Sequence, residues 1–184
     1  GGANSDSVGY DGTGNFRVNL SLTGPQDTWE GMDSFISIED VYGGEGNDSL
    51  TGDGFANNLG GGHGNDTLAG GAGNDYLNGS SGNDSLDGGS GDDNLYGDAG
   101  NDIIAGGTGD DWIEGDGYLY GSDGQPVYDD WGDMIRDHNA DRFVFGAGDG
   151  IDSVQSSDEG LDVIVVTSGA ASFADISLSW GPGA

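Results

Sequence analysis

Aspartates that recur at a fixed interval are the residues of this sequence most suited to a chemical role. From Gly43 the chain realigns with itself every nine residues through eight units, and the sixth position is Asp in seven of them. The seven are Asp48, Asp66, Asp75, Asp84, Asp93, Asp102 and Asp111. Carboxylates at one regular spacing offer the hard oxygen ligands that cations such as calcium prefer. The repeat therefore predicts a series of metal sites.

Glycines occupy most of the first, second and fourth positions of the same units. Glycine suits a turn that takes positive φ angles or approaches an ion closely, because a Cβ would obstruct both. Backbone carbonyls in such turns can complete an oxygen shell of about 6–8 ligands. The glycines expected to line the sites are Gly43, Gly61, Gly62, Gly64, Gly70, Gly71, Gly73, Gly79, Gly82, Gly88, Gly89, Gly91, Gly97, Gly100, Gly106 and Gly109.

The aliphatic residue at the eighth position of every unit indicates the strands that position the aspartates and glycines. Its residues are Leu50, Leu59, Leu68, Leu77, Leu86, Leu95, Ile104 and Ile113. A three-residue strand with one inward aliphatic side chain, followed by a six-residue turn, can close a flat coil after two units. The pattern predicts an all-β parallel solenoid in which turns on one side come from alternate units.

This run resembles the glycine- and aspartate-rich nonapeptide repeat of RTX proteins, GGxGxDxUx. The resemblance implies a calcium-loaded parallel β-roll, a right-handed solenoid with β caps at both ends. It also implies a module of a secreted, extracellular bacterial protein that folds when it binds calcium outside the cell and so supports type I secretion.

Stacking of alternate units sorts the sixth positions into two columns, and neighbours in a column define an interval for one ion. One column joins Asp48, Asp66, Asp84 and Asp102, and the other joins Asn57, Asp75, Asp93 and Asp111. Five intervals have two aspartates each, whereas the interval that begins at Asn57 lacks one carboxylate and has Phe55 in place of the fourth-position glycine. We expect about five or more calcium ions and a poor or empty site at Asn57.

The composition narrows the choice of partners. The chain has 34 acidic residues against 3 Lys and Arg, giving a net charge of −31, which excludes nucleic acid and anionic membrane surfaces as partners. No apolar run approaches the roughly 18 residues of a membrane span, so we expect no membrane insertion. Because low hydrophobicity and high charge otherwise predict disorder, metal binding and folding should be one event.

Both flanks of the repeats carry strand signals. Alternation over residues 16–22 predicts a half-buried strand. Ile36, Ile38 and Val41 are expected to begin the stack, with Trp29 in the core of a cap. The chain then divides into an N-terminal cap and lead-in (1–42), the β-roll (43–114), an inserted loop or hairpin (115–132), and degenerate coils with a C-terminal cap (133–184).

The inserted segment leaves a second function open. Tyr118, Tyr120 and Trp131 could stack on sugar rings, which would make the chain a polysaccharide- or cell-surface-binding adhesin module. The same aromatics could instead bury against a roll that lacks a core of its own, and we favour this packing role.

Beyond the insertion, the stretch from Asn139 onward resembles the segment that follows the repeats in many RTX proteins. That resemblance implies that Phe143 and Phe145 plug the core. Further candidate ligands in less regular surroundings are Asn57, Asp141, Asp149 and Asp152.

Catalysis by this chain is not expected. It has no Lys, and its three Arg and two His suggest no arranged nucleophile and base. The start at Gly1-Gly2, without a Met or an apolar leader, predicts a piece of a larger protein that could itself be an enzyme.

Overall fold

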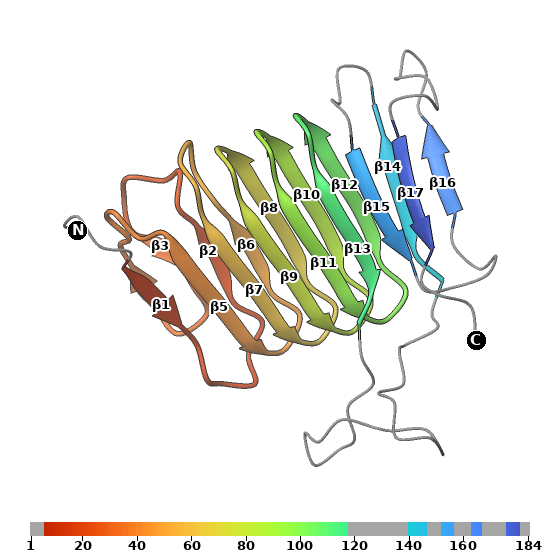
Figure 1. Ribbon diagram of the computed structural model, residues 1–184. Coiled ribbons are helices and arrows are strands. Elements are labelled where there is room, and N and C mark those ends of the chain that lie inside the picture. The colour runs from red at the N-terminus through yellow and green to blue at the C-terminus, as the bar shows by residue number, and fades with distance from the viewer. Residues whose placement is uncertain (1–5, 118–139, 147–151, 157–162, 167–175, 181–184) are drawn as a thin grey trace.

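The protein is an all-β solenoid over the part of the chain that can be described. The computed structural model describes residues 6–117, 140–146, 152–156, 163–166 and 176–180. These residues contain strands, turns and loops and no helix, and hence no helix able to cross a membrane. The chain alternates between two parallel sheets, so the predicted fold class is confirmed (Figure 1).

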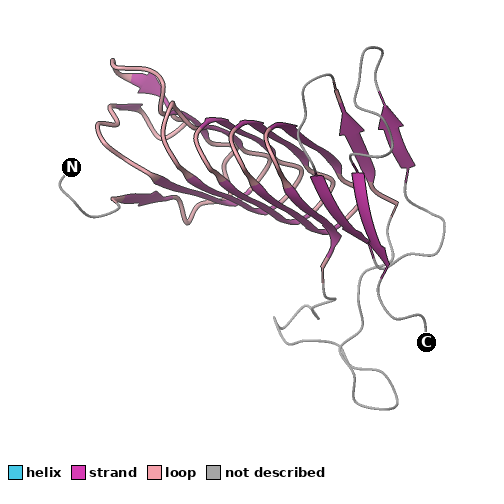
Figure 2. Ribbon diagram, turned by 45° about the horizontal axis from the view of Figure 1, so that its top comes forward, coloured by secondary structure: helices cyan, strands magenta, loops and turns pink. Residues whose placement is uncertain are grey.

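Two sheets make up the walls of the solenoid. The first sheet contains, in spatial order, β1 (Ser7–Gly9), β5 (Asp40–Glu45), β7 (Asn58–His63), β9 (Tyr76–Ser81), β11 (Asn94–Ala99), β13 (Trp112–Asp116), β15 (Asp152–Ser156) and β17 (Ile176–Trp180). The second contains β16 (Val163–Val166), β14 (Arg142–Phe145), β12 (Ile103–Thr108), β10 (Ser85–Ser90), β8 (Thr67–Ala72), β6 (Ser49–Thr51) and β2 (Arg17–Asn19). Turns follow one another along the edges between the sheets (Figure 2).

Neighbouring strands of one sheet come from units 18 residues apart. Leu59 of β7 lies opposite Leu77 of β9, and Leu68 of β8 lies opposite Leu86 of β10. Most repeat strands have six residues rather than the expected three, because the chain stays extended through the third position of the next unit. Only three residues remain for each turn, so the sixth-position side chain is held close to the strand that follows it.

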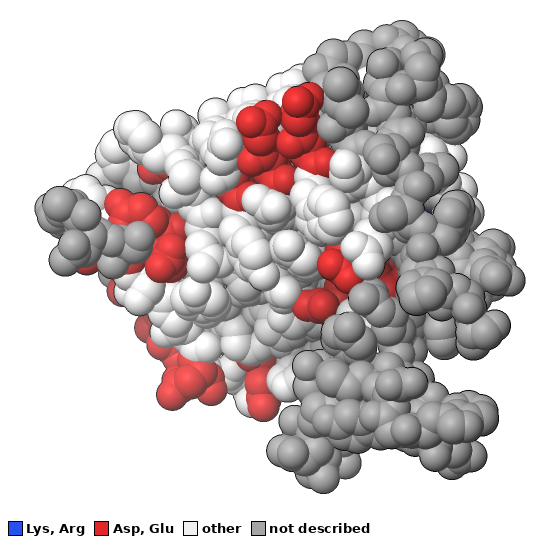
Figure 3. Space-filling model, viewed as in Figure 1, with Lys and Arg blue, Asp and Glu red and all other residues white. Residues whose placement is uncertain are grey.

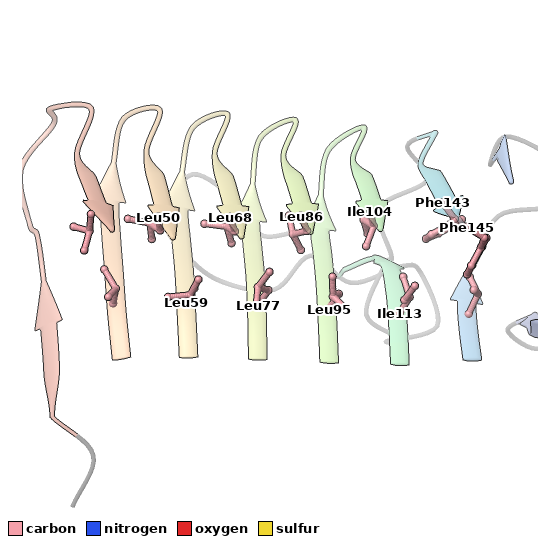
Figure 4. Close-up of a cluster of buried hydrophobic side chains, with 13 residues drawn as sticks. Leu50, Leu59, Leu68, Leu77, Leu86, Leu95, Ile104, Ile113, Phe143 and Phe145 are labelled. Atoms are coloured by element: carbon pink, nitrogen blue, oxygen red, sulfur yellow. The ribbon is translucent and has the colours of Figure 1, made fainter. Parts of the chain in front are cut away.

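Aliphatic side chains from both sheets fill the narrow interior. The eighth-position residues Leu50, Leu59, Leu68, Leu77, Leu86, Leu95, Ile104 and Ile113 are all at most 1% exposed. Figure 4 shows them as two facing rows, one from each sheet. One buried aliphatic residue per unit is a small core, so it cannot by itself offset the ordering of nine residues.

The coils continue beyond the last regular repeat. Phe143 of β14 pairs with Ile104, and Val154 of β15 pairs with Ile113. Phe143 and Phe145 are each 1% exposed and extend the aliphatic rows, which confirms the predicted aromatic plug (Figure 4). The roll therefore retains its register across a segment that the repeat pattern does not cover.

A coil that the sequence analysis did not identify precedes the repeats. Val8 of β1 pairs with Val41, and Val18 of β2 pairs with Leu50. The predicted strand over residues 16–22 is shorter than expected, because β2 ends at Asn19 and Leu22 is 48% exposed.

Two expectations for the N-terminal cap were wrong. Trp29 and Ile36 are each 72% exposed, so neither belongs to a core. Both residues fall in the connection between β2 and β5, where β3 (Gln26–Asp27) and β4 (Met32–Asp33) form a small antiparallel hairpin apart from the two main sheets. Val41, by contrast, is fully buried in β5, and Ile38 is partly buried against the core.

Candidate metal centre

The sixth-position aspartates stack in two columns along the edges of the roll. In one column the backbone N–H of Asp48 donates to Oδ1 of Asp66 at 2.7 Å, and Asp66 N–H donates to Oδ1 of Asp84 at 2.7 Å. In the other column Asp75 N–H donates in the same way to Asp93 at 2.8 Å. Each carboxylate is thereby fixed in direction by the turn before it in its column.

The second carboxylate oxygen of these aspartates is buried and makes no hydrogen bond. Among the described residues this holds for Oδ2 of Asp48, Asp66, Asp75, Asp84 and Asp93. Each of these side chains is at most 2% exposed. Because a buried carboxylate oxygen without a hydrogen-bond partner is costly, it marks a place suited to a positively charged ligand.

A glycine at the first position of each unit leaves the space that faces this oxygen. A Cβ on Gly43 would collide with Oδ2 of Asp48 and would lie 2.7 Å from the carbonyl oxygen of Gly61. A Cβ on Gly70 would likewise collide with Oδ2 of Asp75 and lie 2.6 Å from the carbonyl oxygen of Gly88. The space therefore has a carboxylate on one side and a carbonyl from the next coil on another.

The fourth-position glycines bring successive turns close together. Gly64 has a φ of +125°, and a Cβ there would overlap the carbonyl group of Gly46. Positive φ at low cost and contact with a neighbouring backbone are both specific to glycine. Carbonyl oxygens of adjacent turns are consequently placed near one another at the edge of the roll.

Burial dominates the electrostatics of the columns. Burial, with a smaller contribution from neighbouring carboxylates, raises the pKa of Asp84 and of Asp93 from 3.8 to about 7, although backbone N–H donors oppose the shift. The pKa of Asp48 rises to about 6 for the same main reason. Ionised carboxylates in these positions therefore require a nearby positive charge.

The oxygen-only surroundings fit calcium rather than a softer metal. Among the described residues no three His, Cys, Asp or Glu side chains converge, so each interval offers carboxylates from the stacked aspartates and otherwise carbonyls. Calcium accepts 6–8 oxygen ligands in flexible geometry, including carbonyls and water. The carboxylate and carbonyl oxygens of the intervals, and the carboxylate oxygens without a hydrogen-bond partner, therefore fit a calcium ion.

Asn57 occupies the sixth position of the second unit and differs from the aspartates. Its Oδ1 accepts the N–H of Asp53 at 2.8 Å, and its Nδ2 donates to the carbonyl of Glu39 at 3.3 Å. The neighbouring Phe55 is 74% exposed and does not adopt positive φ. The Asn57 side chain is thus engaged by hydrogen bonds within the protein, and the poor interval at Asn57 stays a prediction.

A ladder of side-chain amides runs beside the aspartates and was missed in the sequence. The N–H of Asn47 donates to Oδ1 of Asn15 at 2.9 Å, that of Asn65 to Asn47 at 2.8 Å, and that of Asn83 to Asn65 at 2.8 Å. The fifth position is Asn or Asp in every unit that has a fourth-position Gly. That regularity was the available signal.

Phe16 stands at one end of a column in the place of an aspartate. Its N–H donates to Oδ1 of Asp48 at 2.7 Å, as Asp48 N–H does to Asp66. The ring of Phe16 is 1% exposed and stacks on Tyr10 with centroids 4.2 Å apart. An apolar ring thereby closes the column, and the sequence signal for this coil is Gly12, Gly14 and Asn15 at the second, fourth and fifth positions.

Of the remaining predicted site residues, one lies in an aspartate column, one lies beside a column, and the others fall outside the described part of the chain. Asp141 follows Asp102 in its column, since Asp102 N–H donates to Oδ1 of Asp141 at 2.8 Å. The backbone of Asp152 begins β15, beside the end of the column that contains Asp111. The expected residues Asp149, Tyr118, Tyr120 and Trp131 lie outside the described part of the chain.

Comparison with known protein families identifies the ion that the aspartate columns bind. The family model of the RTX calcium-binding nonapeptide repeat matches in four overlapping copies, at residues 42–77, 60–95, 70–104 and 96–117. Residues 42–117 belong to the RTX calcium-binding repeat family. Neither the curated proteins nor the solved structures contain a significant match to the chain.

RTX repeats bind calcium, so the carboxylate columns are part of a calcium-binding β-roll. The matched segment includes all eight units and extends to Gly117. It is a structural calcium-binding module rather than a catalytic one. The partnerless Oδ2 atoms of the RTX turns indicate where in the roll positive charge is needed.

Proposed function

We propose that this chain is a calcium-dependent folding module that stabilises a larger extracellular bacterial protein and supports its type I secretion. The observation that carries the proposal is the burial of aspartates whose Oδ2 atoms have no hydrogen-bond partner. In an unfolded chain these oxygens would be hydrated, so folding without a cation would sacrifice their hydration.

The net charge strengthens the coupling between calcium and folding. At −31 the chain repels itself, and the roll brings its carboxylates closer together than a coil does. Bound calcium supplies positive charge to the columns and oxygen coordination to the carboxylates. Because the stacked intervals share aspartates, we expect calcium binding to be cooperative. The dissociation constant should be about 10⁻⁴–10⁻³ M, as is typical of extracellular calcium modules.

We assign one ion to each interval between two stacked aspartates. The intervals are Asp48–Asp66, Asp66–Asp84, Asp84–Asp102, Asp102–Asp141, Asp75–Asp93 and Asp93–Asp111. The hydrogen-bonding pattern is the same throughout these intervals, which supports treating Asp141 as equivalent to the regular positions. The glycines at the first, second and fourth positions are proposed to contribute carbonyl oxygens.

A calcium titration of metal-stripped protein tests the folding switch. Far-ultraviolet circular dichroism should show a cooperative coil-to-β transition with calcium between about 10⁻⁵ and 10⁻² M, and none with magnesium. Native mass spectrometry should then count at least five bound ions. A stripped protein that is already fully β-structured, and that calcium leaves unchanged in stability, would contradict the proposal.

Secretion is tested separately by fusing the chain to a type I secretion signal. The intact repeats should emerge and become resistant to protease in a calcium-containing medium. A variant with Asp66, Asp84 and Asp102 changed to Asn should emerge but remain sensitive to protease. Equal resistance of both exported chains would show that calcium-driven folding outside the cell is not the role of the repeats.

The alternative function, glycan binding by the inserted segment, depended on Tyr118, Tyr120 and Trp131. These residues lie outside the described part of the chain, so no structural observation favours that version of the hypothesis.

A further inference from the structure

The outer face of the first sheet carries a row of aromatic side chains. Tyr42 of β5, Tyr76 of β9, Tyr96 of β11 and Trp112 of β13 stand at seventh or ninth positions, where side chains point away from the core. The same positions of the described second-sheet strands hold no aromatic residue. The outward seventh and ninth positions contribute neither to the aliphatic core nor to the aspartate columns, so neither role explains why aromatics gather on one sheet.

A groove crosses this face between two of the tyrosines. It has a volume of about 340 Å³ and is lined by Tyr42, Asn58, Gly60, Gly62, Tyr76 and Asn78. Because β7 lies between β5 and β9, the glycines of β7 form the floor between Tyr42 and Tyr76. This size falls at the lower end of small-molecule sites, which span roughly 300–1,000 Å³.

The Tyr42 ring is arranged as a platform. A Cβ on Gly60 would lie 2.9 Å from Cδ1 of Tyr42, so the ring lies against the bare backbone of Gly60. Tyr42 is nevertheless 44% exposed, and Tyr76 is 42% exposed. The face of an aromatic ring is electron-rich and attracts the weakly positive C–H groups of an apolar surface. The C–H face of a pyranose ring is such a surface.

Amide and hydroxyl groups surround the platform. Asn58 Nδ2 donates to the hydroxyl of Tyr42 at 3.1 Å, and Asn78 Nδ2 donates to Oδ2 of Asp98 at 2.6 Å. These bonds fix both amides in orientation beside the groove. Aromatic faces with fixed donors and acceptors at their margins suit a ligand that is apolar on its ring faces and polar around its rim.

Charge favours a neutral ligand. The residues that line the groove carry no charge of either sign, and the net charge of −31 on the chain opposes anions. On the face drawn in Figure 3, the acidic side chains of the described residues lie in separate clusters among uncharged ones. Nucleic acids, anionic lipids and acidic polysaccharides would therefore be repelled.

The aromatic row also extends beyond the groove. Tyr76 and Tyr96 have ring centroids 5.2 Å apart, and Trp112 follows on the next strand. Adjacent strands are about 4.8 Å apart, so the row runs across the strands along the length of the roll. A linear chain of several sugar rings could contact successive members of such a row.

We propose that the outer face of the first sheet binds a neutral, linear glycan, with the groove between Tyr42 and Tyr76 as its principal subsite. This site is separate from the inserted segment. The calcium columns position it by holding the strands in register, but none of its side chains is a proposed calcium ligand. Failure of glycan binding and failure of calcium-driven folding are therefore distinguishable.

The test is a calorimetric titration of the full chain, folded in excess calcium, with cellohexaose and with mannohexaose. At least one of these neutral probes should bind, and Tyr42→Ala and Tyr76→Ala should each weaken binding about tenfold. Ile103→Ala is the matched control, because Ile103 is 44% exposed on the outer face of the second sheet. It should alter affinity by less than about twofold.

Circular dichroism in calcium verifies that each variant is folded, and Asn78→Ala provides a second variant with a smaller change at the surface. Absence of binding to both probes by the unmodified chain would overturn the proposal. So would equal losses in Ile103→Ala and Tyr76→Ala, tighter binding of the anionic hexamer of galacturonate, or a tyrosine-dependent dimer seen by sedimentation in place of glycan binding.

Discussion

The backbone N–H of Asp102 donates to Oδ1 of Asp141 at 2.8 Å, although the two residues are 39 positions apart. The equivalent bond elsewhere in the column joins aspartates 18 positions apart. A Cβ on Gly115 would collide with Oδ2 of Asp141, just as one on Gly61 would collide with Oδ2 of Asp66. Gly115 and Asp141 are thus two parts of one further repeat unit, interrupted by the intervening residues.

This split unit predicts that Asp141 holds a calcium ion. Asp141→Asn should lower the number of bound ions by one in native mass spectrometry and raise the calcium midpoint of folding. Asp87→Asn is the matched control, because it removes one carboxylate from an exposed position of β10. If Asp141→Asn retains the full ion count, the interval between Asp102 and Asp141 does not bind calcium.

Asp84 is shared by two intervals, so its substitution should weaken calcium binding more than substitution of Asp141, which borders one. Asp84→Asn keeps an oxygen that can accept the Asp66 N–H but removes the charge. We expect the calcium midpoint to rise about tenfold or more, equivalent to at least about 1.4 kcal/mol, with two fewer ions bound.

Asn57→Ala provides the comparison for Asp84. It should lower stability through the lost hydrogen bonds to Asp53 and Glu39, yet leave the ion count unchanged. Equal effects of Asp84→Asn and Asn57→Ala on ion number would contradict the assignment of ions to intervals between stacked aspartates.

Acidification should weaken calcium binding. The pKa of Asp84 and Asp93 is raised by burial to about 7 in the metal-free roll, above the ordinary value of 3.8. Their protonation therefore stabilises the metal-free roll at low pH, and this contribution is lost as the pH rises through about 7. The aspartates of the unfolded stripped chain keep the ordinary pKa of 3.8, so the protonated, metal-free roll becomes favoured over the coil as the pH falls from about 7 towards about 4. Calcium competes with these protons, so the calcium midpoint should increase as the pH falls from about 6 to about 4.

Proton release provides an independent check on this competition. Calcium added to the stripped chain in weak buffer near pH 4 should acidify the solution, because the aspartates of the unfolded chain are partly protonated at this pH and lose protons as they bind the ion. A midpoint that stays constant over the same pH interval, without proton release, would show that the carboxylates are already ionised before calcium arrives.

The sequence predicted the regular part of the roll because every coil there has the same length. With nine residues per unit, the inward position of Leu77 and the column position of Asp75 follow directly from phase. The same reasoning predicted the difference at Asn57. It did not predict that strands extend to six residues, since the conformation of first- and second-position glycines depends on the neighbouring coil.

The nine-residue spacing no longer predicts a residue's position where a connection of irregular length separates two coils. Phe16 occupies the column before Asp48, yet 32 residues separate them instead of 18. The apolar character of Trp29 and Ile36 suggested a core, but both belong to that long connection and remain exposed. Asp141 illustrates the same limit at the other end, because the intervening residues conceal its equivalence to the regular aspartates.

The last prediction concerns the space beside the first-position glycines. Gly61 does not adopt positive φ, so Gly61→Ala changes the space that faces Oδ2 of Asp66 without imposing backbone strain. The added methyl group would occupy the region proposed for calcium and displace the carboxylate. We expect a loss of about 1–3 kcal/mol in the free energy of unfolding, measured with urea in excess calcium.

Gly54→Ala is the control for this prediction. Gly54 is exposed, does not adopt positive φ, and has no atom within 4 Å of its would-be Cβ. Its substitution should change stability by less than about 0.5 kcal/mol. The ion count separates the two causes of any loss: Gly61→Ala should bind fewer ions, whereas a variant that is less stable with all its calcium retained would place the methyl group outside the metal site.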